Sequence, residues 1–263
     1  MCYYNAIKIK ANDVIHLKGI DKKPVQGDLF NPVQSGFEYP QWPVIVPEKN
    51  CTWEIKMMEW GFIPPYLHNR DAVKKMREGY KTEDGKFKPP LIMLNAVSEE
   101  ILLTKKIFRN AALERRCLVL SSGFYEWRHV HPIGKNGRIL KTAVKYPYHI
   151  TLKNAPYFFM AGIWQSWTDT GSGEMVDSFA IITTAANPLM EKIHNTKKRM
   201  PVILPEPLAA EWISDGLDEK RILEIAGYQN DANEMEAHTV AKNFREAMNP
   251  MEAFMYMELD KID

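Results

Sequence analysis

Cysteine is scarce in this chain of 263 residues, which contains Cys2, Cys51 and Cys117. Three widely spaced cysteines give neither a disulfide framework nor the paired spacing of a zinc site, and they favour a reducing compartment. Long apolar runs are absent as well: no segment reaches the length of a membrane span, and no apolar core of a signal peptide follows the N-terminus. We therefore expect a cytoplasmic protein with no membrane partner.

An excess of charge of one sign and phosphate-binding loops are also lacking. The formal net charge is +1 at pH 7, so a nucleic-acid site would have to be a local basic patch. Because there is neither a glycine-rich phosphate loop nor a cluster of cysteine and histidine residues, we predict no metal ion and no nucleotide cofactor. Hydrophobic residues make up 45% of the chain, which is ordinary for a globular protein with a sizeable core.

The apolar segments are mostly short and favour strands over helices. Segments rich in β-branched or aromatic residues predict strands at 116–121, 148–152, 157–163, 178–183 and 201–204. Amphipathic patterns and caps predict helices at 98–112, 187–194, 207–214 and 218–226. Because no regular βαβ alternation appears, we predict one α+β domain over residues 1–263, built on mainly antiparallel sheet.

Turn-forming residues mark the segments 19–40, 68–90 and 131–141. The second segment is basic, and its cations are Lys74, Lys75, Arg77, Lys81, Lys86 and Lys88. A solvated insertion and an arm that contacts nucleic acid explain this composition equally well. Residues 245–263 are interpreted as a C-terminal extension.

The position of Cys2 gives the first chemical signal. Methionine before a small residue is commonly removed in cells, which would leave an α-amine and a thiol on adjacent carbons of one residue. An α-amine titrates near about 7.7–8.0 and is partly neutral at neutral pH, whereas lysine titrates near about 10.4. Such an amine condenses with an aldehyde to a Schiff base, and the thiol then closes a thiazolidine ring. Taken alone, the pattern also fits an unremarkable second residue.

Three further polar residues occupy positions that suit either chemistry or structure. Glu126 lies between Tyr125 and Trp127, where desolvation would raise its pKa for proton transfer, unless it points to solvent. His194 follows a predicted helix and is either an acid or base near neutral pH or a structural histidine. Asn95 ends an apolar run, and its amide would orient an aldehyde or form a turn.

Two segments offer contacts for single-stranded nucleic acid. Trp60 and Phe62 lie in an aromatic segment with prolines, and they would stack bases or pack in the core. After His194 come Lys197, Lys198 and Arg199, which would hold phosphates.

Several motifs, taken in order, resemble those of the SRAP family (SOS response-associated peptidases, also called abasic-site processing proteins). They are Met-Cys at the start, WGFIP at 60–64, NA-x-SE at 95–99, RCLVLSSGFYEW at 116–127, AGIWQSW at 161–167, and TTAAN with a later RMPVIL within 183–204. The resemblance extends over most of the chain, from residue 2 to residue 204, with a weaker echo near residue 240.

The resemblance implies a distorted barrel-like sheet with flanking helices and a cleft that receives single-stranded DNA, bound by a monomer. It also implies that Cys2 forms a covalent thiazolidine cross-link with the ring-opened aldehyde of an abasic site, which shields the lesion during the DNA damage response. Asn95 would orient the sugar, Glu126 would shuttle protons and promote strand-cleaving β-elimination as a side reaction, and His194 would help to open the sugar ring. The peptidase activity in the family name corresponds to self-removal of Met1.

The DNA contacts expected from these patterns and from the resemblance are Trp60, Phe62, Ser98, Lys197, Lys198, Arg199, Met200 and Pro201. Two positions depart from the family pattern: Val97 replaces an arginine that contacts the phosphate backbone, and the insertion 195–198 follows the histidine. The alternative function is therefore a non-covalent single-stranded-DNA-binding module that has lost its chemistry. A peptidase acting on other proteins would need an oxyanion hole, for which the sequence gives no signal.

Overall fold

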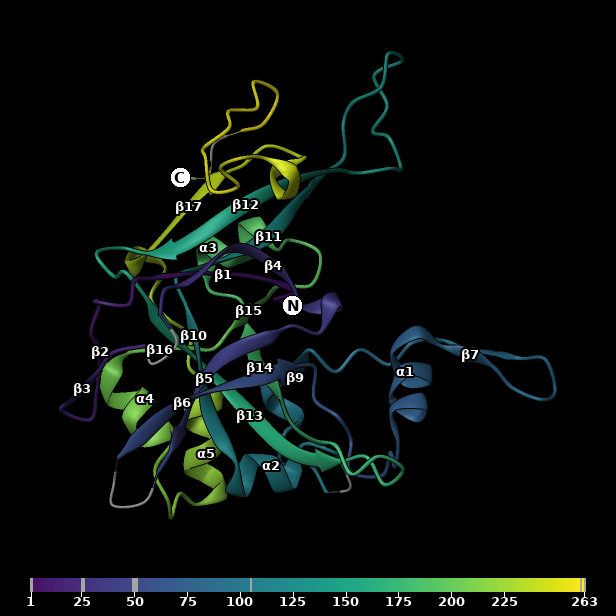
Figure 1. The fold of residues 1–263 in the computed structure, drawn as a ribbon. Coiled ribbons are helices and arrows are strands. Elements are labelled where there is room, and N and C mark those ends of the chain that lie inside the picture. Colours follow the sequence, from purple (N-terminus) through teal and green to yellow (C-terminus); the bar gives the residue numbers. More distant parts are fainter. Residues whose placement is uncertain (1, 25–26, 49–51, 105, 261, 263) are drawn as a thin grey trace.

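The computed structural model describes residues 2–24, 27–48, 52–104, 106–260 and 262, so Met1, Cys51 and one residue of the helix predicted over 98–112 lie outside the described residues. Two large β-sheets, two small two-stranded sheets and several short helices make up the fold (Figure 1).

The smaller sheet has the N-terminal strand in its interior. Its five strands lie side by side in the order β17 (Met235–Thr239), β12 (Val144–Leu152), β11 (Gly123–Val130), β1 (Tyr4–Ile9) and β4 (Leu29–Ser35). All neighbours are antiparallel, and Tyr4 lies opposite Tyr125 on one side and Ser35 on the other. Pairing along both edges of β1 therefore fixes the residues that precede it.

The larger sheet closes on itself. Its path of hydrogen-bonded strands runs β15 (Arg199–Pro201), β14 (Met175–Ala185), β6 (Trp53–Trp60), β5 (Gln41–Pro47), β10 (Arg116–Ser121), β13 (Phe158–Thr168) and β16 (Ile203–Leu204). Strands β13 and β14 also pair with each other, which turns the five strands from β14 to β13 into a closed barrel. The short strand β9 (Asn95–Val97) pairs in parallel with β14 outside this ring.

Both sheets enclose one hydrophobic core. Ile7 and Phe124 from the smaller sheet belong to the same buried cluster as Val44, Leu118 and Ile181 from the barrel. Most strand pairs are antiparallel, and β14 pairs in parallel with β6 and β9. The α+β class and the distorted barrel-like sheet are thus confirmed.

Three predicted helices are confirmed with small shifts: α3 (Pro188–Ile193), α4 (Glu206–Trp212) and α5 (Glu219–Ala226). The side chain of Asn187 caps α3 by accepting from the Met190 N–H at 2.9 Å. Trp212 fastens α4 to the barrel, because its indole N–H donates to the carbonyl of the buried Cys117. Among the described residues, the helices are all too short or too polar to cross a membrane.

The predicted helix over 98–112 is wrong. Residues Ser98–Glu100 form a single 3-10 turn, and α2 covers only Arg109–Glu114. The Arg109 guanidinium donates to the carbonyl of Leu102, which in a continuous helix would accept from a backbone N–H one turn later. Buried Ile101 and Leu102 pull this stretch into the core instead.

Two segments interpreted as turns contain regular structure. Segment 19–40 holds β3 (Ile20–Lys22), which pairs with β2 (Ile15–Leu17), and then β4 and a 3-10 turn (Gly36–Glu38). Segment 68–90 holds α1 (Arg70–Glu78) and the hairpin of β7 (Tyr80–Lys81) and β8 (Phe87–Lys88). In Figure 1 this segment projects from the body as an arm.

The remaining predictions hold with different boundaries. Segment 131–141 is a projecting loop with one bridge between Ile133 and Ile139. Strands predicted at 148–152, 157–163 and 178–183 lie within β12, β13 and β14, which are longer. The strand predicted at 201–204 is divided at Val202, whose N–H donates to the Ile182 carbonyl.

Candidate functional site

The four residues predicted to carry chemistry meet where the barrel adjoins the smaller sheet. Cys2 precedes β1, Glu126 lies within β11, Asn95 begins β9 and His194 follows α3. The Asn95 side-chain amide donates a 3.0 Å hydrogen bond to the Cys2 carbonyl. His194 Nε2 lies 3.8 Å from Glu126 Oε2. Elements that are distant in the sequence thus converge on one site.

The Cys2 side chain is fully buried and its Sγ lies 3.8 Å from the Tyr4 carbonyl oxygen, to which it donates. Burial, and after it the charge of Glu126, raises the pKa of the thiol well above its ordinary value. The thiol is therefore protonated at neutral pH, unlike cysteines activated as thiolates. The thiol would therefore need a base to take its proton before the sulfur could attack a substrate.

Glu126 and His194 form a pair whose pKa shifts oppose those of an ion pair. Burial raises the pKa of Glu126 to about 7 and lowers that of His194 to about 4. Attraction between the two charged groups at 3.8 Å would shift both pKa values in the opposite direction, so the cost of burying the charges is larger than that attraction. Glu126 is only 4% exposed, which rules out the interpretation that it points to solvent. Near neutral pH its carboxyl group can both give and take a proton.

The tautomer of His194 follows from its backbone contact. Its Nδ1 lies 2.8 Å from the carbonyl oxygen of Arg199. Because a carbonyl can only accept, Nδ1 carries the proton of the neutral ring, and Nε2 presents a lone pair toward Glu126.

The glycine of SSGFYEW has a packing role. A Cβ at Gly123 would lie 2.3 Å from Nε2 of His149, whose ring lies over this backbone. The preceding Ser121 donates to the side chain of Asn5 at 2.5 Å, which fastens the end of β10 to β1. The motif thus brings β11 close to β1 and aligns Glu126 with the chain end at Cys2.

Comparison with known proteins identifies the family. The sequence pattern of the SOS response associated peptidase (SRAP) family matches residues 1–247. The chain belongs to the SRAP family.

Relatives and solved structures agree with this assignment. The abasic site processing protein YoqW of Bacillus subtilis is 34% identical over 184 residues, which cover 70% of this chain and 68% of YoqW. The abasic site processing protein HMCES of Xenopus tropicalis is 26% identical over 177 residues, 60% of this chain and 44% of HMCES. A crystal structure of a protein from Bacteroides thetaiotaomicron superimposes with a TM-score of 0.74 at 27% identity, covering 97% of this chain and all of that one.

In this SRAP chain the aromatic residues predicted to stack DNA bases are core residues, which corrects the prediction. Trp60 and Phe62 are both 0% exposed. The Trp60 indole donates to the Leu94 carbonyl at 3.0 Å, and the Phe62 ring packs edge-on against Phe108 at 5.1 Å between centroids. Neither ring has a face that a base could reach.

The other predicted DNA contacts divide between buried and exposed positions. Ser98, Met200 and Pro201 are buried, so their side chains do not offer a DNA surface either. Arg199 makes two hydrogen bonds to the carboxylate of Glu99, at 2.7 and 2.8 Å, which occupies its guanidinium. Exposed cations remain at Lys197 and Lys198.

The two departures from the SRAP pattern, Val97 and the insertion 195–198, do not separate the four residues of the candidate site. Asn195, the first residue of the insertion, exchanges two hydrogen bonds with the His129 backbone on β11, at 3.0 and 2.8 Å. The insertion is thereby fixed to the strand that carries Glu126. Val97 is half-buried in β9, beside β14.

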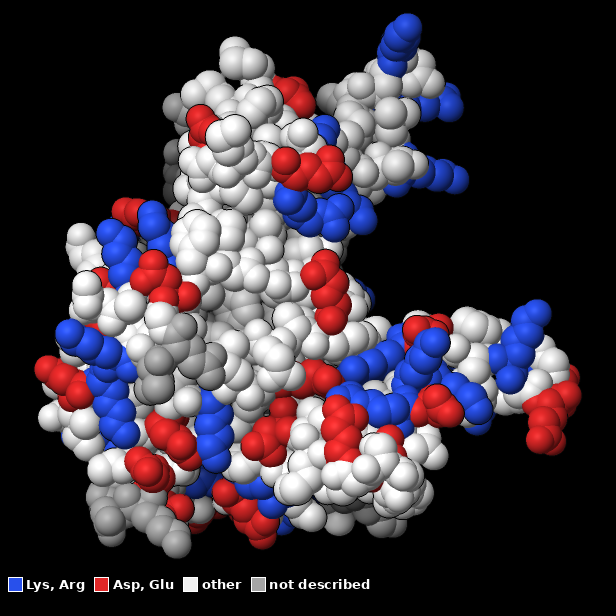
Figure 2. Space-filling view, viewed as in Figure 1, with Lys and Arg blue, Asp and Glu red and all other residues white. Residues whose placement is uncertain are grey.

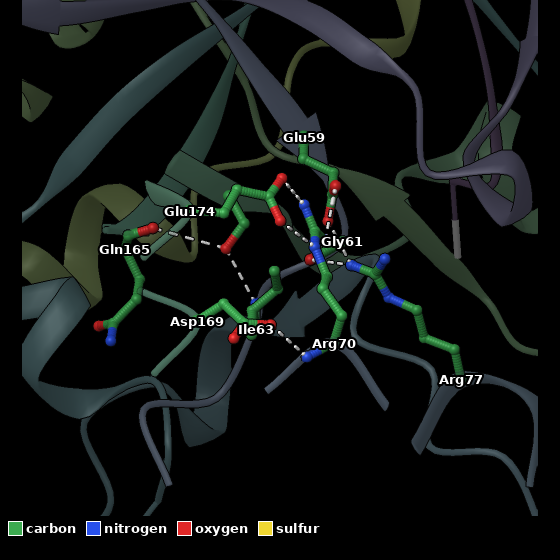
Figure 3. Close-up of polar contacts among 9 residues, drawn as sticks. Glu59, Gly61, Ile63, Arg70, Arg77, Gln165, Asp169 and Glu174 are labelled. Atoms are coloured by element: carbon green, nitrogen blue, oxygen red, sulfur yellow. Dashed lines mark hydrogen bonds and ion pairs between the residues drawn. The ribbon is translucent and has the colours of Figure 1, made fainter. Parts of the chain in front are cut away.

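A partly buried ion-pair network near the WGFIP motif was not predicted from the sequence (Figure 3). Glu59, only 8% exposed, accepts from Arg77 at 2.6 Å and from Arg70 at 3.2 Å. Arg70 also binds Glu174 through two hydrogen bonds of 2.9 and 2.7 Å. The network fastens α1 to β6 and to the turn that precedes β14. No signal in the sequence distinguishes Glu59 from Glu54 on the same strand.

Gly61 of the same motif is required by its surroundings. Its φ is +139°, and a Cβ there would lie 2.5 Å from the ring of Tyr39.

In the part of the chain that the structure describes, no group of three or more His, Cys, Asp or Glu residues is placed to hold a metal ion.

Proposed function

We propose that this chain processes abasic sites by binding single-stranded DNA and forming a covalent thiazolidine cross-link between Cys2 and the ring-opened abasic aldehyde. The observation that carries the proposal is the 3.0 Å hydrogen bond from Asn95 to the Cys2 carbonyl, which holds the nucleophilic residue in the same site as Glu126. Membership of the SRAP family, with relatives named abasic site processing proteins, supports the choice of substrate.

The reaction begins with the α-amine. Removal of Met1, by self-hydrolysis of one peptide bond, frees the amine, because an acylated nitrogen cannot form an imine. Neutral His194 Nε2 takes the hydroxyl proton of the closed sugar and gives it to the ring oxygen as the C–O bond breaks, which yields the aldehyde and a free sugar hydroxyl. The Cys2 nitrogen then attacks the aldehyde carbon to give a carbinolamine.

Glu126 serves both following steps. In its acid form it protonates the carbinolamine hydroxyl, which leaves as water and gives an iminium ion. The resulting carboxylate takes the thiol proton of Cys2, sulfur bonds to the iminium carbon, and the C=N electron pair moves to nitrogen. The carboxyl group ends protonated, as it began, and one water is lost overall.

The same iminium ion provides the side reaction. If the carboxylate of Glu126 removes a proton from the sugar carbon next to the iminium instead, the 3′ phosphate leaves and the strand is cut. Asn95 favours ring closure by holding the Cys2 backbone, and its side-chain oxygen has no hydrogen-bond partner among the described residues, so it can accept from the sugar.

Intact-mass spectrometry tests the proposal. Protein lacking Met1 is incubated with an oligonucleotide that bears one abasic site, and we expect a new species equal to protein plus oligonucleotide less one water. Cys2→Ala should abolish this species, and Cys117→Ala, which removes a buried thiol in β10, should retain it. A mass that never changes, with a free Cys2 amine, would overturn the covalent function and favour the non-covalent binding module instead.

A further inference from the structure

A groove lies beside the candidate site and is lined by residues outside the SRAP motifs. Figure 2 shows the molecular surface hollowed between the two projecting arms, the loop at 131–141 and the α1 segment. On the α1 side the hollow includes a groove of about 580 Å³ whose lining includes Phe37, Tyr39, Lys74, Arg77 and Ile92. Its volume is sufficient for one nucleotide.

An aromatic pair connects this groove to the site. Tyr3 follows Cys2 directly, and its ring centroid lies 4.9 Å from that of Phe37, which lines the groove. Burial and then the charge of Glu126 raise the pKa of Tyr3, which places the ring near the carboxyl group as well. Phe37 is 44% exposed and Tyr3 is half-buried, so the pair presents an aromatic surface between groove and nucleophile.

The cations of the groove differ in availability. Arg70 also lines the groove and is committed to Glu174 and Glu59. Arg77 is committed to Glu59 and to the Gly61 carbonyl, and its guanidinium lies 3.7 Å from the centre of the Tyr39 ring. Lys74 is exposed on α1 and makes no ion pair with a carboxylate among the described residues.

Acidic residues limit what the groove can hold. Asp71 and Glu78 line it together with Lys74. The groove therefore suits a single phosphate at Lys74, with an apolar and aromatic wall beside it, rather than a run of phosphates.

We propose that this groove binds the intact nucleotide next to the abasic one, with its base on the Tyr3 and Phe37 rings and its phosphate at Lys74. The inference rests on the proposed function for the position of the abasic sugar at Cys2. Bases stack on exposed aromatic rings irrespective of sequence, and a lysine neutralises one phosphate. The substrate is thus a strand in which an undamaged nucleotide adjoins the lesion.

Equilibrium binding of a fluorescent single-stranded oligonucleotide without an abasic site tests the groove apart from the covalent chemistry. Phe37→Ala should weaken binding by about 5-fold or more, the range for loss of one stacked base. Phe37→Tyr, which keeps a ring, should bind as the wild type does. Phe30→Ala is the matched control, because Phe30 is 63% exposed on the neighbouring strand β4 and is not part of the groove.

The phosphate contact has its own readout. Lys74→Gln should lower the slope of log affinity against log salt by about 0.7, the value for one phosphate of a single strand. Lys75→Gln is the control, because Lys75 is the next residue of α1, is also exposed and lies outside this groove.

The outcomes separate this inference from the proposed function. Unchanged affinity in Phe37→Ala together with an unchanged salt slope in Lys74→Gln overturns the groove, as does a wild type that does not bind the intact strand. If both variants behave as expected but no cross-link forms with abasic DNA, the groove stands and the proposed covalent function fails.

Discussion

Replacing Glu126 by glutamine should stabilise the fold at alkaline pH while it slows the chemistry. The carboxyl group is 4% exposed, and burial raises its pKa from 4.5 to about 7. Glutamine has nearly the same volume and is neutral at every pH. The substitution therefore removes the cost of burying a carboxylate and, with it, the group that gives and takes the proton.

The sign and the size follow from the pKa shift. A folded pKa above the unfolded value means that ionisation opposes folding, so stability is full below pH 4.5 and falls as the pH rises toward 7 and above. One pKa unit corresponds to about 1.4 kcal/mol, so the full penalty in the wild type is about 3 kcal/mol above pH 7. Between pH 5 and pH 8.5 the wild type should lose about 2.5 kcal/mol relative to Glu126→Gln.

Urea unfolding of both proteins at pH 5 and pH 8.5 measures this difference, and other titrating groups cancel in the comparison. A gap in the free energy of unfolding that is the same at both pH values would refute the raised pKa. The cross-linking rate of Glu126→Gln should fall by about 100-fold or more, the usual contribution of a general acid or base. A stabilised variant that still reacts at the wild-type rate would remove Glu126 from the mechanism.

Three further substitutions test how the site and the α1 arm are held. Gly123→Ala should lower the free energy of unfolding by about 1–3 kcal/mol, because the new methyl group would lie 2.3 Å from the His149 ring, and His149→Ala in the same chain should restore part of it in urea unfolding. Asn95→Ala should slow cross-linking by about 100-fold in a single-turnover assay with little change in affinity for intact DNA, because the nucleophile loses its 3.0 Å support. Glu59→Gln should lower the free energy of unfolding by about 3 kcal/mol and make the α1 arm sensitive to protease, because Arg77, with a side chain 10% exposed, would lose its charged partner. An arm that resists protease as before would show that the ion pair does not hold it.

Strands β5 and β6 of the barrel were not predicted, because two prolines interrupt the first and three charged residues interrupt the second. Strands β10, β13 and β14 were predicted because their residues are largely apolar on both faces. Segment 116–121 is buried at every position in β10, and a run of that kind in a short segment leaves few alternatives. The arm was not predictable in the same way. Helix α1 has one buried residue, Val73, and owes its position to Glu59 on a distant strand, a contact that local pattern does not record.

In the candidate site, too, some features were predictable from the sequence and others were not. Motif order indicated Cys2, Asn95, Glu126 and His194, and the structure brings these residues together. The aromatic residues of WGFIP were assigned to DNA because exposure cannot be read from residue type alone. Stacking between Trp60 and Phe179, with ring planes 11° apart, makes that motif part of the core.

The position of β1 has a mechanical consequence. Under the proposed chemistry the DNA is bonded to Cys2, two residues before a strand that is hydrogen-bonded on both sides, to β11 and to β4. A motor that pulls on the DNA along this strand would load both rows of hydrogen bonds in shear at once, rather than peel an edge strand one bond at a time. The attachment point should therefore resist a pull along β1 better than an edge strand would.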